Sequence, residues 1–225
     1  TGSFTVAVCP AASEWCVVKS QPDSESFRPT ASLGALQRRA ELLRRLRKFF
    51  DDRGFVEVET PLLADEIIPE LHIEPIRACN GQFLQSSPEL HMKRLVASGA
   101  TAIYQVTRSF RRDERGPLHN PEFTIVEWYR VGDDLNAGMN LLDELVTALL
   151  DTQPAARTTY AEAFLRTLNL DPHTASVADL ATAASAGGVS VPSGIEADDR
   201  DEWLNLLLAT RVEHQLGRDR PEILY

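Results

Sequence analysis

Apolar residues, most of them β-branched or aromatic, dominate two segments in the middle of the chain, residues 103–110 and Glu122–Arg130. A polar loop with Gly116-Pro117 at its turn separates them, and this pattern predicts a long antiparallel hairpin. Because side chains alternate along a strand, each strand is expected to present every second residue on a common face. On the second strand that face carries Phe123, Ile125, Glu127 and Tyr129. On the first strand and its continuation the corresponding set is Gln105, Thr107, Ser109 and Arg111.

Helical periodicity predicts most of the remaining elements. Residues 33–50 read as a helix followed by Gly54, and residues 55–59 as a strand that stops at Thr60-Pro61. Short strands are expected at residues 71–76 and 82–85. After the hairpin, helices are expected at residues 135–150, 160–168, 177–186 and 199–216, and the final apolar run resembles the start of another strand. The fold class is therefore α+β.

The domain organisation follows from these elements. Residues 1–29 form an N-terminal arm and linker, with two short apolar runs at 4–8 and 15–18 that read as small strands or as part of an ordered arm. Residues 30–225 then form one domain, whose part from 135 to 216 is mostly helical.

Ser86-Ser87-Pro88-Glu89 opens a helix that runs through Ala97, and three interpretations of it remain open. Ser87 can cap the helix, with Pro88 at its first position and Glu89 in its first turn. Ser86 and Glu89 can instead form a capping box one position earlier. The third interpretation is a ligand site.

Composition narrows the function classes. The net charge of −10 argues against a broad nucleic-acid-binding surface. The longest apolar stretches fall well below the roughly 18 residues of a membrane span, and no signal peptide is evident. Three cysteines without CxxC spacing indicate a reduced cytoplasmic protein, with a Cys9–Cys16 disulfide as the minor alternative. His173 and His214 lack metal-ligand spacing, so no metal site is expected within this chain.

The helix at 33–50 also carries a basic set of residues: Arg38, Arg39, Arg44, Arg45 and Arg47. A solvated helix face is the simpler interpretation, and a docking surface for an acidic partner is the other.

The run RSFRRDERGPLHNPEFTIVEWY resembles motif 2 of the class II aminoacyl-tRNA synthetases, in the lysyl-tRNA synthetase branch. More narrowly, SPELHMKRL (residues 87–95), HNPEFT (residues 119–124) and EWYR (residues 127–130) resemble the elongation factor P–lysine ligases, which modify a protein instead of a tRNA. The resemblance covers roughly residues 33–225. It implies a class II synthetase catalytic fold, an antiparallel sheet flanked by helices, and a homodimer built on the helix and strand before Pro61.

The resemblance also assigns roles to residues. Arg111 would be catalytic, holding the ATP α-phosphate and the substrate carboxylate together with its forked guanidinium. The ATP-binding set would be Arg111, Arg112, Asp113, His119, Asn120 and Phe123. The set that binds the amino acid would be Ser87, Pro88, Glu89 and Tyr129, and Glu127 would meet an ammonium group. Asp113 stands where the family has a glutamate.

The same residues have simpler interpretations. Phe123 and Tyr129 can be core aromatic residues, and the charges from Arg111 to Arg115 can form an exposed ion-pair cluster.

The implied reaction is ATP-dependent activation of lysine or β-lysine as an adenylate, followed by transfer to a lysine of elongation factor P. ATP and Mg²⁺ would be required, and motif 3 and the metal ligands are expected beyond Tyr225, so the chain is expected to be an incomplete domain that is inactive alone. A tRNA is not expected as a partner, because an anticodon-binding barrel needs on the order of 100 residues before the catalytic domain. The alternatives are the catalytic core of a lysyl-tRNA synthetase and a non-catalytic paralogue that serves as a dimeric binding module.

Overall fold

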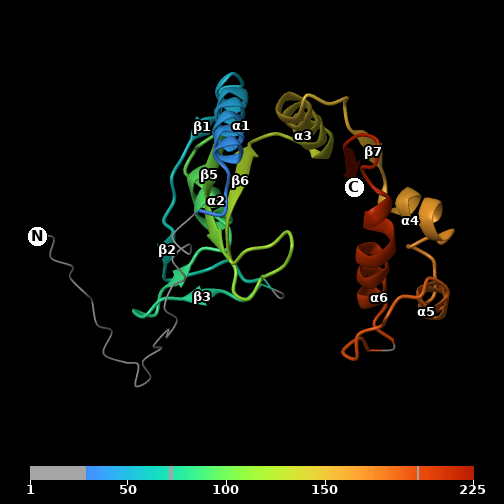
Figure 1. The fold of residues 1–225 in the computed structure, drawn as a ribbon. Helices are drawn as coiled ribbons and strands as arrows, with labels where there is room; N and C mark the ends of the chain where they lie inside the picture. The colour runs from blue at the N-terminus through green and yellow to red at the C-terminus, as the bar shows by residue number, and fades with distance from the viewer. Residues whose placement is uncertain (1–28, 71–72, 197) are drawn as a thin grey trace, which may run out of the picture. The chain divides into compact units, whose positions relative to one another are not determined.

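The computed structural model describes residues 29–70, 73–196 and 198–225. Within them the chain divides into two compact units, of which the first ends at Gly132 and the second is Asp133–Tyr225 (Figure 1). The expected N-terminal arm, including its two apolar runs and the Cys9–Cys16 pair, lies outside the described residues apart from Pro29. The assignment of residues 30–225 to one catalytic domain stays a prediction.

The first unit begins with helix α1, Leu33–Asp51, as the periodicity predicted. Ser32 caps it, because its side chain accepts a hydrogen bond from the Ala35 N–H at 3.2 Å. The helix buries its C-terminal apolar residues against the hairpin, where the Phe50 ring stacks on Tyr104 with centroids 4.5 Å apart. Figure 1 shows α1 alongside β5 and β6. Trp128 contacts the same Phe50 ring at 5.5 Å, so this aromatic cluster fixes one face of the hairpin.

The hairpin itself is confirmed: β5, Ala102–Phe110, pairs antiparallel with β6, Glu122–Arg130, over nine residue pairs. A third strand, β1, Val56–Glu57, lies parallel to β5 on its other edge. It is shorter than the predicted 55–59, because the Phe55 N–H closes the turn after α1 by donating to the Phe50 carbonyl at 3.1 Å. Pro61, which has no N–H, follows the strand.

A second small sheet has the order β2-β4-β3, with bounds Leu63–Ala64, Phe83–Leu84 and Ile76–Arg77. The strand expected at 82–85 is present as β4, whereas the one expected at 71–76 is wrong in its bounds. Residues 71 and 72 lie outside the described part, the Ile73 N–H turns back to the Glu70 carbonyl at 3.4 Å, and Pro75 has no N–H to donate. Pairing therefore starts only at Ile76. Helix α2, Glu89–Ala97, follows this sheet.

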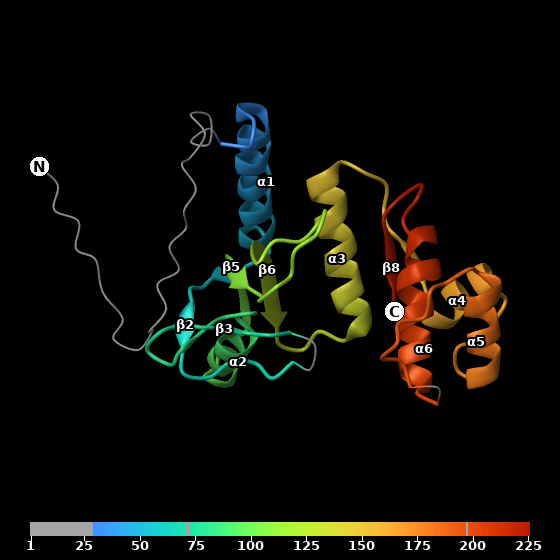
Figure 2. The same ribbon diagram turned by 60° about the horizontal axis from the view of Figure 1, so that its bottom comes forward.

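The second unit is mostly helical, as predicted. Its elements in chain order are α3 Leu135–Leu150, β7 Ala156–Thr158, α4 Tyr160–Leu168, α5 Val177–Ala186, α6 Arg200–Leu207, the π-helix η1 Leu208–Val212, the 3₁₀ helix η2 Glu213–Gln215 and β8 Glu222–Leu224. Figure 2 shows α4, α5 and α6 side by side, and their core is built around Phe164, Leu180 and Leu207, all fully buried. Strand β8 pairs parallel with β7. No helix in the described ranges combines the length and apolarity needed to cross a bilayer.

The prediction of one helix over residues 199–216 is wrong, because this segment is not one continuous α-helix. After Leu207 it widens into the π-helix η1 and then tightens into η2. The Thr210 hydroxyl donates to the Leu206 carbonyl at 2.6 Å, a side-chain bond four residues back that bends helices. Apolar spacing alone does not report such a change in backbone winding.

Candidate functional site

The predicted face of the hairpin is confirmed by the strand register. Its cross-strand pairs are Ser109 with Phe123, Thr107 with Ile125, Gln105 with Glu127 and Ile103 with Tyr129. The opposite face carries Tyr104 and Trp128 against Phe50. Because α1 occupies that second face, the face with Glu127 and Tyr129 is the one left for a ligand.

Glu127 is the centre of a hydrogen-bonded cluster on this face. The Ser87 hydroxyl donates to Glu127 Oε2 at 2.7 Å, and the Tyr129 hydroxyl donates to Glu127 Oε1 at 2.6 Å. Burial first, and then the hydrogen bond and negative charge of Glu127 and the charge of Glu89, raise the pKa of Tyr129. Tyr129 therefore stays protonated and acts as a donor, which orients the carboxylate.

Glu89 adds a second carboxylate near this cluster. Its backbone N–H donates to the Ser87 hydroxyl oxygen at 3.1 Å, and its side chain forms an ion pair with Lys93 one helical turn later. Lys93 offsets the charge of Glu89, whereas the Glu127 carboxylate is held by two neutral hydroxyl donors and keeps its negative charge, which favours an ammonium group.

The three interpretations of the segment before α2 are now separated. Pro88 occupies the N-cap position rather than the first helical position, and Ser87 binds the Glu89 N–H as a partial cap. The capping box of Ser86 with Glu89 is wrong, because the buried Ser86 hydroxyl has no hydrogen-bond partner among the described residues. Ser87 also reaches Glu127, which a capping role alone does not require.

Arg111 lies at the end of β5, where the hairpin loop begins. Its backbone N–H donates to the Pro121 carbonyl at 2.9 Å, and its guanidinium carbon lies 5.0 Å from the centroid of the Phe123 ring. One guanidinium nitrogen lies 3.6 Å from Glu114 Oε1. Its Nε is buried and has no partner among the described residues. A buried donor of this kind calls for an acceptor, and a phosphate or carboxylate oxygen fits its chemistry.

The rest of the loop is more exposed. Arg112 is held by Glu74, through a 2.7 Å ion pair and a 2.9 Å hydrogen bond from its backbone N–H to the Glu74 carbonyl. Asp113 adopts a left-handed conformation with φ of 59°, and its carboxylate lies 3.8 Å from Arg112 Nε. His119 exchanges backbone hydrogen bonds with Gly116 across the loop, and Asn120 is exposed.

The structure thus groups the sequence-derived residues in two sets. Ser87, Glu89, Glu127 and Tyr129 form one, and Arg111 with Phe123 forms the other. No hydrogen bond or ion pair joins these two sets within the part of the chain that the structure describes. Phe123 and Tyr129 are half-buried, which fits a partly packed aromatic residue as well as one that lines a site, so both interpretations stay predictions. Ion pairs are present in the loop at Arg112 and at Arg111. The catalytic, ATP-binding and amino-acid-binding roles all stay predictions.

Two residues that support the site were missed by sequence reasoning. Gln85 is buried, and its side-chain NH₂ group donates to the Arg108 backbone carbonyl at 2.7 Å, while the backbone carbonyl of Gln85 accepts a hydrogen bond from the Phe110 N–H at 2.9 Å. It ties the segment before Ser87 to the hairpin. Glu74, which holds Arg112, lies 38 residues away in sequence, and no local signal marks it.

Comparison with known sequences agrees with this arrangement. The sequence model for the class II tRNA synthetases (D, K and N) matches residues 26–199. The chain belongs to this family. It is 41% identical over 212 residues to proteins named elongation factor P–(R)-beta-lysine ligase from Yersinia pestis (strain Pestoides F) and Yersinia pseudotuberculosis serotype O:1b (strain IP 31758). The match covers 90% of this chain and 65% of each relative, so the chain spans about 65% of their length.

Membership of the class II synthetase family confirms the expected fold class, in which an antiparallel hairpin is flanked by helices. The assignment of the hairpin and its loop to motif 2 stays a prediction. The described residues contain no group of three or more His, Cys, Asp or Glu side chains arranged for a metal ion. The expectation that Mg²⁺ ligands lie beyond Tyr225 stays a prediction.

Proposed function

We propose that the protein is an ATP-dependent ligase that activates lysine or β-lysine as an aminoacyl-adenylate and transfers it to a lysine of elongation factor P. The observation that carries the proposal is the cluster in which Ser87 and Tyr129 hold the Glu127 carboxylate, beside Glu89. The 41% identity to proteins named elongation factor P–(R)-beta-lysine ligase supports the choice of substrate and acceptor.

In the first step a carboxylate oxygen of the amino acid attacks the α-phosphorus of ATP, and pyrophosphate leaves. The attacking group is already anionic, so no general base is needed, and positioning together with fixed positive charge dominates catalysis. Arg111 supplies that charge, with its unpartnered Nε facing the phosphate or carboxylate oxygens and Phe123 packing beside the nucleotide base. Glu89 and Glu127 receive the ammonium group of the amino acid.

In the second step the neutral amine of a lysine on elongation factor P attacks the adenylate carbonyl. An amide bond forms, the bond from the carbonyl carbon to the phosphate oxygen breaks, AMP leaves, and the proton of the amine passes to solvent. Cleavage of ATP to AMP and pyrophosphate is thereby coupled to protein modification. We place this reaction in the cytoplasm, with Mg²⁺ as the counter-ion of ATP and a homodimer as the working form.

The deciding experiment gives the full-length protein ATP, lysine or (R)-β-lysine, elongation factor P and tRNA in one mixture. We expect elongation factor P to gain the mass of one lysyl or β-lysyl group on a lysine side chain, with pyrophosphate released. Preferential charging of tRNA would favour a lysyl-tRNA synthetase, and absence of pyrophosphate exchange would favour a non-catalytic paralogue. Glu127→Gln is expected to raise the KM for the amino acid while leaving the KM for ATP near the wild-type value.

A further inference from the structure

The second unit concentrates its few positive charges in one place. Residues 133–225 contain sixteen acidic residues, six arginines and no lysine. Four of the six arginines line one cavity of about 710 Å³, namely Arg166, Arg211, Arg218 and Arg220. Two carboxylates, Asp219 and Glu222, line it with them. In a unit where acidic residues outnumber basic ones, this cavity has a net positive lining.

These arginines lie on three different parts of the chain. Arg166 comes from α4, Arg211 from the π-helix η1, and the other two from the segment between η2 and β8. A π-helix inserts one extra residue per turn, and such turns are concentrated at functional sites. Here the wide turn carries Arg211, so the irregular backbone and the charged cavity coincide.

Gly187 makes room for the Arg211 guanidinium. A β-carbon built on Gly187 would lie 1.5 Å from one guanidinium nitrogen of Arg211 and 2.7 Å from its central carbon. The φ of Gly187 is −82°, which any residue adopts, so the absence of a side chain matters here for space and not for backbone conformation. The end of α5 therefore positions Arg211.

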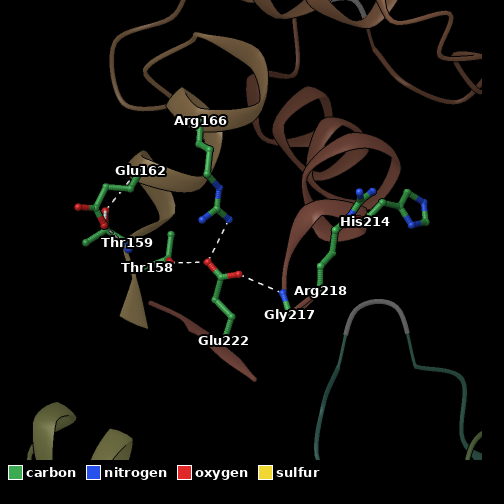
Figure 3. Close-up of polar contacts among 8 residues, drawn as sticks. All are labelled: Thr158, Thr159, Glu162, Arg166, His214, Gly217, Arg218 and Glu222. Carbon is green, nitrogen blue, oxygen red and sulfur yellow. Dashed lines mark hydrogen bonds and ion pairs between the residues drawn. The ribbon is translucent and has the colours of Figure 1, made fainter. Parts of the chain in front are cut away.

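One of the four arginines is already neutralised. The Glu222 carboxylate is 8% exposed, accepts hydrogen bonds from the Thr158 hydroxyl and from the Gly217 N–H, and pairs with Arg166 at 3.0 Å (Figure 3). These contacts, with the Thr158 hydrogen bond the largest, lower the pKa of Glu222, so it is charged at neutral pH.

The remaining three arginines differ from Arg166 in that none of them forms an ion pair in the described part of the chain. Arg218 Nε donates to the His214 carbonyl at 3.0 Å, which fixes its side chain. Across the described ranges, no ion pair engages Arg211, Arg218 or Arg220. Three arginines that form no ion pair among the described residues thus line a small-molecule-sized cavity.

We propose that this cavity is a binding site for a small phosphate-bearing molecule, separate from the hairpin. Guanidinium groups match the oxygens of phosphate in a bidentate fashion, and four arginines against two carboxylates complement a dianionic phosphate group. The hydroxyl and amide side chains of Thr167, Gln153 and Gln215 supply neutral donors in the same lining. The site lies wholly in the second unit and does not depend on the proposed ligase activity.

Calorimetric titration with inorganic pyrophosphate tests the proposal, in an Arg111→Ala background that removes the expected phosphate contact of the hairpin. We expect pyrophosphate to bind this variant, and the added pair Arg211→Gln and Arg218→Gln to weaken binding by about tenfold or more. Arg157→Gln is the matched control, because Arg157 is an exposed arginine of the same unit that bonds Asn140 and does not line the cavity. It is expected to leave binding unchanged.

Gly187→Ala is a second variant that keeps every charge but displaces the Arg211 guanidinium. It should weaken pyrophosphate binding to about the same extent as Arg211→Gln, and it should add nothing when combined with that substitution. Failure of the Arg111→Ala protein to bind pyrophosphate, or equal weakening by Arg157→Gln, would overturn the proposal. Equal affinity for citrate would overturn the assignment to phosphate. Failure of the ligase assay leaves each of these outcomes unaffected.

Discussion

Single side chains on the hairpin show how a small set of contacts prepares a site for two oppositely charged ligands. Glu127 is held by Ser87 and Tyr129 so that its carboxylate has a defined orientation. Arg111, four residues past Thr107 on the same strand face, rests beside Phe123 with a buried nitrogen that no described residue accepts from. An anionic group attracts an ammonium and a cationic group attracts phosphate or carboxylate, which is why the proposed function assigns the amino acid to the first and ATP to the second.

The forked shape of Arg111 matters as much as its charge. We expect Arg111→Lys to lower the rate of ATP–pyrophosphate exchange by the full-length protein by about 10²–10³-fold, because one ammonium cannot replace two parallel donors at the transition state. Arg108→Lys is the matched control, since Arg108 lies on β5 three residues before Arg111 and forms an exposed ion pair with Glu122 at 3.6 Å. Exchange at the wild-type rate in Arg111→Lys would argue that the residue is not catalytic.

At the scale of elements, capping residues stabilise individual helices, whereas packing decides which helix faces are buried. Helices α4 and α5 both begin with a capping box, formed by Thr159 with Glu162 and by Ser176 with Asp179. Hydrogen bonds from the cap hold the pKa of Glu162 and of Asp179 below their ordinary values. Helix α1 is different, because several leucines near its start remain exposed: Leu33 at 70%, Leu36 at 49% and Leu42 at 40%.

Removal of one capping side chain should destabilise the second unit measurably. We expect Thr159→Ala to lower the free energy of unfolding by about 1 kcal/mol, because the N–H of Glu162 loses its acceptor. Urea denaturation followed by circular dichroism measures the change. Thr159→Ser retains the hydroxyl and should stay close to wild type, and an equal loss in that variant would assign the effect to something other than the cap.

The exposed leucines of α1 support the proposed homodimer. Burial of apolar helix surface against a second copy would remove it from water, whereas a charge placed there opposes association. We expect Leu36→Glu to shift the protein toward monomer in light scattering at micromolar concentration. Leu165→Glu, which changes an exposed leucine of α4, is the control expected to leave the mass unchanged. A monomeric wild-type protein would contradict the homodimer.

At the scale of the whole molecule, charge is distributed unevenly along the chain. Residues 133–225 carry sixteen acidic residues against six arginines, which accounts for the entire net charge of −10. The part before residue 133 has as many basic as acidic residues. The acidic composition that argued against a broad nucleic-acid surface therefore describes the second unit, and it makes the basic cavity there more distinctive.

Tyrosine residues in both units make the stability of the protein depend on pH in the alkaline range. Burial is the largest cause that raises the pKa of Tyr104, Tyr129 and Tyr160. Nearby carboxylates add to it for Tyr104 and Tyr129, whereas for Tyr160 the charge of Arg200 opposes it in part. An unfolded chain loses these protons near pH 10, about the ordinary tyrosine value, whereas the folded chain retains them. The stabilisation is thus complete below about pH 10 and is lost as the pH rises through the folded-state pKa.

Absorbance at 295 nm measures this directly. We expect at least three of the four tyrosines to remain protonated in the folded protein at pH 10 and to ionise when denaturant is added. Tyr129→Phe should remove one of the protected groups. Ionisation of all four tyrosines near pH 10 in the folded state would show that these hydroxyls are accessible and unperturbed.

The sequence alone determined the local order of the molecule. The residue patterns of β5 and β6 and the spacing of leucines in α3 extend over a few residues, so the positions of these elements follow from the pattern. The cap signals before α2 were less reliable, because Pro88 occupies the N-cap position and Ser86 forms no capping box. The resemblance of the loop motif indicated Arg111 and Phe123, and that of SPELHMKRL indicated Glu89, and their roles stay predictions. Where backbone geometry departed from the simple period, as at Pro75 and in η1, the predicted bounds were wrong.

Only the tertiary structure decided which distant groups meet. The bond from Ser87 to Glu127 spans 40 residues, the one from Arg112 to Glu74 spans 38, and the pair of Arg166 with Glu222 spans 56. The physical reason is that such contacts depend on strand register, helix packing and the space left by a glycine such as Gly187. A local pattern carries none of these, because each is set by parts of the chain that become neighbours only after folding.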